Sequence, residues 1–107
     1  MVLKKIGLTG STGMLGRHLR AALEKAGAMV VPVSRTATLN HVTPCWDLAE
    51  WLVPEDLDGL FAGVQAVIHA GAIVQPSGKV DVARMYDANV RACLNLGEWA
   101  ISRNIPV

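Results

Sequence analysis

A glycine-rich turn near the start of the sequence constrains the fold more than any other feature. Residues 4–9 (KKIGLT) have the composition of a short buried strand, and residues 10–13 (GSTG) follow them directly. Apolar residues then recur at helical spacing from Met14 to Ala26. A strand that runs through glycines straight into a helix is typical of the first unit of a parallel α/β sheet.

Strand-like and helix-like segments continue to alternate along the rest of the chain. Apolar strands joined by amphipathic helices belong to a parallel sheet that is covered by helices on both faces. We therefore predict one α/β domain over residues 1–107, a doubly wound parallel sheet of about four strands plus a stub. The strands are expected at 4–9, 28–33, 42–46 (weaker) and 64–70, with a stub at 106–107, and the helices at 14–26, 47–50, 54–63 and 79–103.

The last of these helices carries an apolar stripe. Its members recur at spacings of three and four residues, which is the pattern of a helix face turned toward a core. The one tyrosine of the sequence belongs to this stripe and is therefore expected to pack in the core. The stripe comprises Ala83, Tyr86, Val90, Cys93, Gly97 and Ile101.

Composition excludes several classes of protein. Hydrophobic residues make up 51% and charged residues 18%, so the chain can bury enough apolar area to fold. The formal net charge of +1 gives no electrostatic reason to expect nucleic acid or an anionic membrane as a partner. The longest apolar stretch, residues 60–74, contains Gln65 and His69 and is too short and too polar for a transmembrane helix.

The two cysteines point to an intracellular protein. Cys45 and Cys93 lie far apart, without a CxxC motif or a neighbouring histidine cluster, so reduced thiols are expected and a disulfide or metal site is not. Lys4 and Lys5 precede a short strand and glycines, which is unlike a signal peptide. A cytoplasmic location is the expectation.

Each glycine of the first turn has a physical role if the turn binds a diphosphate. Gly10 would permit the tight turn off the strand, Gly13 would let N–H groups approach phosphate oxygens, and Gly16 would let the helix pack close to the sheet. The helix N-terminus adds unpaired N–H donors and the positive end of its dipole. A small-residue turn without a ligand is the alternative, which the order of strand, turn, helix and second strand disfavours. The turn residues expected to bind a dinucleotide are Gly10, Ser11, Thr12, Gly13, Met14, Leu15 and Gly16.

The end of the second strand indicates which dinucleotide is preferred. An acidic residue about 20 positions after the glycines would bind the ribose 2′-hydroxyl of NAD, whereas an arginine suits the 2′-phosphate of NADP. The sequence has Ser34, Arg35 and Thr36 at this point and no acidic residue nearby. NADP is therefore predicted in preference to NAD, with Arg35 as the phosphate ligand. A solvated loop arginine is the alternative interpretation.

With these residues in view, the chain resembles the extended branch of the short-chain dehydrogenase/reductase superfamily, the NAD(P)-dependent epimerase/dehydratase family. Residues 9–16 (TGSTGMLG) are similar to the TGxxGxxG phosphate-binding turn of that family. Asp47 and Leu48 stand where the family places an acidic and an apolar residue around adenine, although Asp47 could also serve as a helix N-cap. The resemblance implies a Rossmann fold that binds NAD(P).

A segment at the end of the predicted strand 64–70 extends the resemblance. His69 and the residues that follow it are similar to an HxAA-type segment of the family. Its small residues let the ribose and nicotinamide lie against the backbone, which implies a cofactor-binding role for Ala70, Gly71 and Ala72. Gly71 departs from the family's alanine, and His69 is expected to be structural rather than catalytic.

A helical segment is a further match. Residues 86–96 (YDANVRACLNL) resemble the family pattern NVxGTxNL. The resemblance implies that Asn89 braces a neighbouring strand near the active site, and an asparagine on the helix surface is the alternative. Ala92 and Cys93 replace glycine and threonine of the pattern.

The resemblance also implies what this chain lacks. Enzymes of the family place a Ser or Thr after a later strand and a Tyr-x-x-x-Lys pair on the next helix, where the lysine lowers the pKa of the tyrosine. Here Tyr86 is followed four positions later by Val90. No catalytic residue is therefore assigned, and the chain is expected to be the cofactor-binding part of a longer enzyme, without the substrate-binding and catalytic part.

The expected function is that of an oxidoreductase, epimerase or dehydratase. The full-length protein would transfer hydride between nicotinamide and a carbinol or carbonyl carbon of a small substrate. The alternatives are a non-catalytic NADP-binding sensor or interaction module, and a fragment with no function of its own. An incomplete sheet leaves an unpaired edge and an uncovered apolar face, so homo-oligomers are expected.

Overall fold

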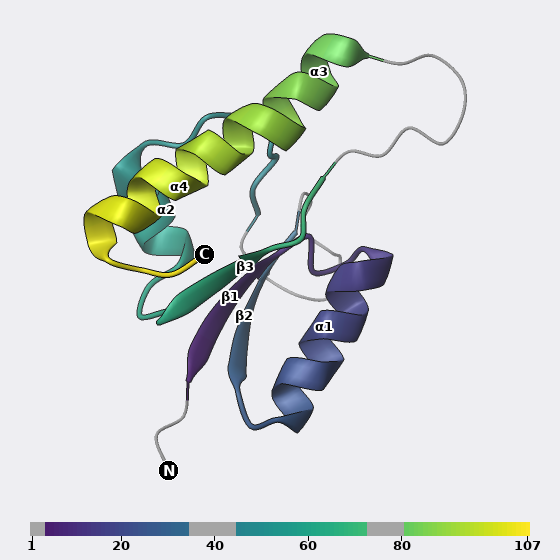
Figure 1. Cartoon of the computed structure of the whole chain (residues 1–107), viewed down its shortest axis with the longest axis vertical. Helices are drawn as coiled ribbons and strands as arrows, with labels where there is room; N and C mark the ends of the chain where they lie inside the picture. Colours follow the sequence, from purple (N-terminus) through teal and green to yellow (C-terminus); the bar gives the residue numbers. More distant parts are fainter. Residues whose placement is uncertain (1–3, 35–44, 73–80) are drawn as a thin grey trace.

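The computed structural model of the chain describes residues 4–34, 45–72 and 81–107. Helices and strands alternate as the sequence predicts (Figure 1). The long last helix contains a π-helical turn. The elements are β1 (Lys5–Thr9), α1 (Met14–Lys25), β2 (Met29–Val33), α2 (Pro54–Leu60), β3 (Ala66–His69), α3 (Val82–Tyr86), the π-helical η1 (Asp87–Arg91) and α4 (Ala92–Arg103).

The three strands of the described residues form a parallel sheet in the order β2-β1-β3. Helix α1 covers one face of it, and α2 and α4 lie on the other (Figure 1), which confirms the doubly wound α/β fold. The central strand ends at Thr9, which is in register with Val33 of β2 and His69 of β3. Val67 N–H donates to the carbonyl oxygen of Pro106 at 2.9 Å, so the end of the chain, where the stub is predicted, lies beside β3 without forming a strand.

The described residues contain three of the roughly four strands predicted. Within the predicted strand 42–46, Cys45 forms an isolated parallel bridge with Ser34, and residues 42–44 lie outside the described ranges. A single bridge beside β2 places this segment at the edge of the sheet.

The helix predicted to begin at 47–50 is a turn instead. Glu50 N–H donates to the Asp47 carbonyl oxygen at 2.8 Å. Asp47 Oδ1 accepts from Ala49 N–H at 3.1 Å. Because the aspartate side chain satisfies a nearby backbone donor, it stabilises a turn as readily as a helix start.

The core lies between the sheet and the pair α2 and α4. Phe61, just after α2, packs against Trp99 of α4 with ring centroids 5.5 Å apart. Trp99 Nε1 donates to Asp58 of α2 at 2.8 Å, so the buried indole also has its polar partner. No helix in the described ranges is both long and apolar enough to cross a membrane. The buried core residues are Val33, Trp46, Leu57, Phe61, Val64, Val67, Ala92, Leu96, Trp99 and Ala100.

The apolar stripe predicted for the last helix is not its buried face. Tyr86, Val90 and Ile101 are 53%, 43% and 80% exposed, so the core position expected for Tyr86 is wrong. The helix has a second apolar stripe at spacings of four residues, through Ala88, Ala92, Leu96 and Ala100, and this second stripe is the buried one. A constant helical period therefore could not identify the face that meets the sheet. The buried residues are Ala88, Ala92, Asn95, Leu96, Trp99 and Ala100.

Candidate functional site

The turn after β1 depends on glycine at its first position. Gly10 has a φ of +65°, a backbone conformation that side chains disfavour. A Cβ built on it would lie 2.7 Å from both the N and the Cα of Gly71. Gly10 and Gly71, 61 positions apart in sequence, are therefore in backbone contact at the ends of β1 and β3.

The turn then closes on itself. Gly13 N–H donates to the Gly10 carbonyl oxygen at 3.1 Å. A Cβ on Gly13 would lie 3.4 Å from that oxygen, and a Cβ on Gly16 would collide with it. The predicted close packing at Gly16 is therefore present, but against the turn rather than against the sheet.

The N-terminus of α1 follows this turn and is uncapped. Gly13 is the N-cap, it offers no side-chain hydrogen bond, and the first turn of the helix holds no acidic residue. Arg17 N–H makes the first helical bond, to Gly13 O at 2.9 Å. The N–H groups of Met14 and Leu15 therefore have no carbonyl partner within the helix. Both side chains are exposed, so this positive end of the helix is open to an anion.

Ser11 and Thr12 occupy different environments within the turn. Ser11 is 4% exposed, and its N–H lies 3.4 Å from the carbonyl oxygen of Val33, which ties the turn to the end of β2. Thr12 is exposed. Arg35, predicted two residues beyond Val33 to bind the 2′-phosphate, lies outside the described residues.

Thr9 joins the ends of β1 and β3 through its side chain. Its Oγ1 accepts from the N–H groups of Ala70 and Gly71 at 3.0 and 3.1 Å. The same oxygen is 2.7 Å from His69 Nδ1. Burial lowers the pKa of His69, because the charged imidazolium loses its hydration. Ala72, the last residue of the predicted segment, is exposed.

Leu48 closes one side of this region. A Cβ on Gly71 would lie 2.6 Å from Leu48 Cδ1, so the leucine occupies the space that a side chain at 71 would need. The structure thus brings the first glycine turn, the backbone after β3 and Leu48 together. This junction lies at the carboxyl ends of parallel strands, where open α/β sheets bind their ligands.

Asp47 forms an ion pair that the sequence did not indicate. Arg84 Nη2 from α3 lies 3.0 Å from Asp47 Oδ2 and 3.3 Å from Oδ1. The Arg84 side chain is 41% exposed and that of Asp47 is 30% exposed. No local pattern relates two residues 37 positions apart, so only the tertiary structure could reveal this pair.

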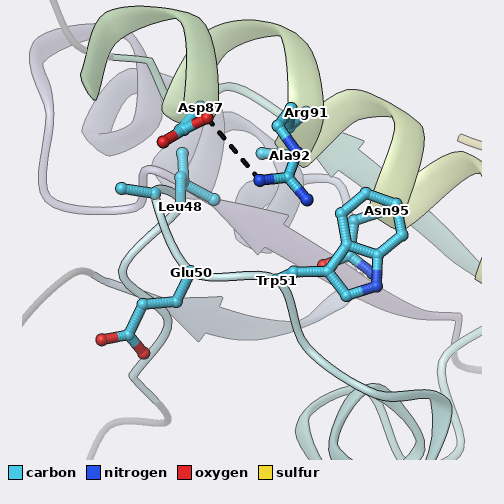
Figure 2. A pocket seen from close by; sticks show the side chains of 8 residues that line it. Leu48, Glu50, Trp51, Asp87, Arg91, Ala92 and Asn95 are labelled. Atoms are coloured by element: carbon cyan, nitrogen blue, oxygen red, sulfur yellow. Dashed lines mark ion pairs between the residues drawn. The ribbon is translucent and has the colours of Figure 1, made fainter. Parts of the chain in front are cut away.

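A narrow pocket lies between residues 48–51 and the last helix, and the residues around it hold the segment that carries Leu48 against that helix (Figure 2). Asn95 of α4 accepts from Leu52 N–H at 2.8 Å and donates to Leu52 O at 2.9 Å. The Arg91 guanidinium lies 5.3 Å from the centre of the Trp51 ring. The pocket has no room for a water molecule, so it fastens the segment to α4 rather than binding a ligand.

Sequence comparison identifies relatives of the chain. The model of the NAD dependent epimerase/dehydratase family matches residues 6–107. D-erythrulose reductase of Gallus gallus is 34% identical over an alignment 105 positions long, and the match covers 85% of this chain and 43% of the reductase. The chain therefore spans less than half the length of this relative.

Solved structures share the fold. A short-chain dehydrogenase/reductase superfamily protein from Agrobacterium tumefaciens, with NAD bound, is 28% identical, has a TM-score of 0.74, and is matched over 94% of this chain and 30% of its own. UDP-N-acetylglucosamine 4-epimerase from Bacillus cereus is 26% identical with a TM-score of 0.75, over 95% of this chain and 34% of its own. The chain thus spans about a third of the length of these structures.

Proposed function

Because this chain belongs to the NAD-dependent epimerase/dehydratase family, we propose that it is the dinucleotide-binding part of an oxidoreductase, epimerase or dehydratase. The complete enzyme transfers hydride between nicotinamide and a carbinol or carbonyl carbon of a small substrate. The bound dinucleotide supplies the redox chemistry, and the residues of this chain bind and orient it.

The observation that carries this proposal is the cradle at the end of β1, formed by the backbone of the glycine-rich turn and the uncapped N-terminus of α1. Gly10 contacts Gly71, Gly16 lies against the Gly10 carbonyl group, and the N–H groups of Met14 and Leu15 are free of helical partners. A diphosphate needs backbone donors that no Cβ obstructs, together with the positive end of a helix dipole. The cradle has both properties.

The neighbouring residues supply the rest of the proposed site. Asp47, still paired with Arg84, would offer a remaining lone pair of its carboxylate to the exocyclic amine of adenine, with Leu48 packed beside the ring. Ala70, Gly71 and Ala72 provide a surface of small residues for the ribose and nicotinamide. The relative from Agrobacterium tumefaciens with NAD bound supports NAD as a ligand for this fold.

NADP is the preferred dinucleotide in this proposal, on the basis of Arg35. A guanidinium at the end of β2 would form a charge-assisted pair with the 2′-phosphate. Arg35→Asp is expected to weaken NADPH binding more than NADH binding, since only NADPH carries that phosphate. Equal losses for the two would remove Arg35 from this role.

Calorimetric titration of the chain with NADPH and NADH tests the proposed function. We expect measurable but weak binding of both, and no dehydrogenase turnover, because no Ser/Tyr/Lys set is assigned in these residues. Gly16→Ala should abolish binding because its Cβ would collide with the Gly10 carbonyl group and displace the turn, whereas Gly97→Ala, on a helix away from the turn, should not. A folded wild-type sample without affinity for either dinucleotide would refute the proposal.

A further inference from the structure

Thr9 and His69, the last residues of β1 and β3, share a short hydrogen bond. Thr9 Oγ1 lies 2.7 Å from His69 Nδ1, and Thr9 is only 1% exposed. The same oxygen accepts from the N–H groups of Ala70 and Gly71. One hydroxyl group therefore joins β1 to the backbone that follows β3.

The hydrogen bonds made by the Thr9 hydroxyl determine which nitrogen of the His69 ring carries the hydrogen. A threonine hydroxyl has two acceptor lone pairs and one hydrogen. The N–H groups of Ala70 and Gly71 use both lone pairs, so Thr9 donates its hydrogen to His69 Nδ1. His69 is then neutral, with its own hydrogen on Nε2. Burial of the ring, which lowers the pKa of His69, favours the same neutral form.

The surroundings of the second ring nitrogen, Nε2, indicate that the useful group of a histidine at position 69 is its acceptor, Nδ1. His69 Nε2 is buried and has no hydrogen-bond partner among the residues that the structure describes. A buried donor without a partner destabilises a fold, and an apolar side chain would avoid that cost. The acceptor at Nδ1 is therefore the feature that an apolar residue could not replace.

We propose that His69 is a positioning residue of the dinucleotide site, which orients the Thr9 hydroxyl and thereby holds the backbone of Ala70 and Gly71. The ring itself does not touch the ligand. The proposal rests on the proposed function, in which ribose and nicotinamide lie against Ala70 and Gly71.

The contact between Gly71 and Gly10 extends this effect to the phosphate-binding turn. A Cβ on Gly10 would lie 2.7 Å from Gly71 N, so the backbones of the two glycines are too closely packed for a side chain to fit between them. If the Thr9 hydroxyl rotated away, the N–H groups of Ala70 and Gly71 would lose their acceptor. Gly71 could then shift, and the diphosphate and nicotinamide ends of the site would lose their relative position.

NMR of the full chain tests the arrangement without any ligand. In the wild type, the ¹⁵N shifts of the His69 ring should show an unprotonated Nδ1 at neutral pH. His69→Leu should speed amide hydrogen exchange of Ala70 and Gly71 about tenfold, whereas His69→Asn, whose side-chain oxygen reaches the Nδ1 position, should keep it slow. A protonated Nδ1, or unchanged exchange in His69→Leu, overturns the proposal, and the first measurement needs no variant to fold.

Titration with NADH then tests the link to the site. His69→Leu and His69→Gln, whose amide reaches the Nε2 position instead, should weaken binding about 3- to 10-fold, and His69→Asn should stay within about twofold of the wild type. A loss in His69→Asn equal to that in His69→Leu overturns the positioning role. Wild-type protein that shows the expected exchange pattern but binds no NADH refutes the dinucleotide function itself, so the two failures are distinguishable.

Discussion

The Cα of Gly16 faces the carbonyl group of Gly10 so closely that a Cβ on Gly16 would collide with the Gly10 oxygen. The same carbonyl oxygen accepts from Gly13 N–H at 3.1 Å. The start of α1 therefore rests directly on the turn that precedes it. What makes this arrangement possible is the absence of a side chain at residue 16, not an attractive contact.

Gly16→Ala should lower the stability of the chain by about 1–3 kcal/mol and abolish NADH binding. The new methyl group meets backbone, which cannot rotate away as a side chain could. Gly97→Ala is the matched control, because Gly97 is also helical and nothing lies within 4 Å of its Cβ position. It should stabilise the chain by up to about 1 kcal/mol through helix propensity. Urea unfolding measures both, and similar values for the two variants would contradict the packing argument.

Gly71→Ala should destabilise the chain by about 1 kcal/mol, and shortening Leu48 should relieve most of the loss. The new Cβ would lie 2.6 Å from Leu48 Cδ1, the movable end of a side chain. In a double-mutant cycle, Leu48→Val should therefore lower the stability of the wild type, which has Gly71. In the Gly71→Ala variant, the same substitution should raise the stability. Additive effects in thermal unfolding would show that the two residues do not share this space.

The elements near the site could be predicted from sequence because their signals are local. The run from residue 5 to residue 16 combines a short apolar strand, glycines where side chains cannot fit, and a helical repeat. Each of these patterns is imposed by the backbone geometry of a few consecutive residues. The strand, the turn and the helix were therefore found at their observed positions.

The relationships that complete the site are not local, and the sequence could not indicate them. Arg84 reaches Asp47 across 37 positions, and Thr9 reaches His69 across 60. Periodicity failed at Tyr86 for a different reason: the last helix carries two apolar stripes, and the one that faces the core, with Ala92 and Leu96, is not the one that contains Tyr86. The turn at Asp47 was mistaken for a helix start because an aspartate side chain stabilises both.

Asn95→Ala should leave the backbone N–H and carbonyl groups of Leu52 without partners, and each group left unpaired should destabilise the chain by about 1–3 kcal/mol. Asn95 is 4% exposed and forms hydrogen bonds with both the N–H and the carbonyl oxygen of Leu52. Asn95→Asp should be at least as harmful, since a carboxylate faces the Leu52 carbonyl oxygen without a donor. Urea unfolding measures both, with the exposed Glu98→Gln on the same helix as control. A midpoint for Asn95→Ala equal to that of the control would contradict the role of this amide.

Asp58 should make part of the stability depend on pH in the acid range. Its Oδ1 accepts from Trp99 Nε1 and Arg103 Nε, and its Oδ2 accepts from Arg103 Nη2 at 2.8 Å. These hydrogen bonds, those from Arg103 first, lower the pKa of Asp58 from 3.8 to about 2. A carboxyl group with a lowered pKa stabilises the fold above its unfolded pKa, and this contribution fades as the pH falls from about 4 toward 2.

Asp58→Asn should therefore be less stable than the wild type at neutral pH, and the difference should shrink as the pH falls from about 4 toward 2. Urea midpoints of both proteins measured across this range give the result. Glu24→Gln is the matched control, because Glu24 also pairs with an arginine at 2.8 Å, but within α1. Asp58 instead joins α2 to α4, so its loss should reduce stability more than the loss of an exposed pair within one helix. A wild-type advantage that stays constant down to pH 2 would show that the charge of Asp58 does not contribute.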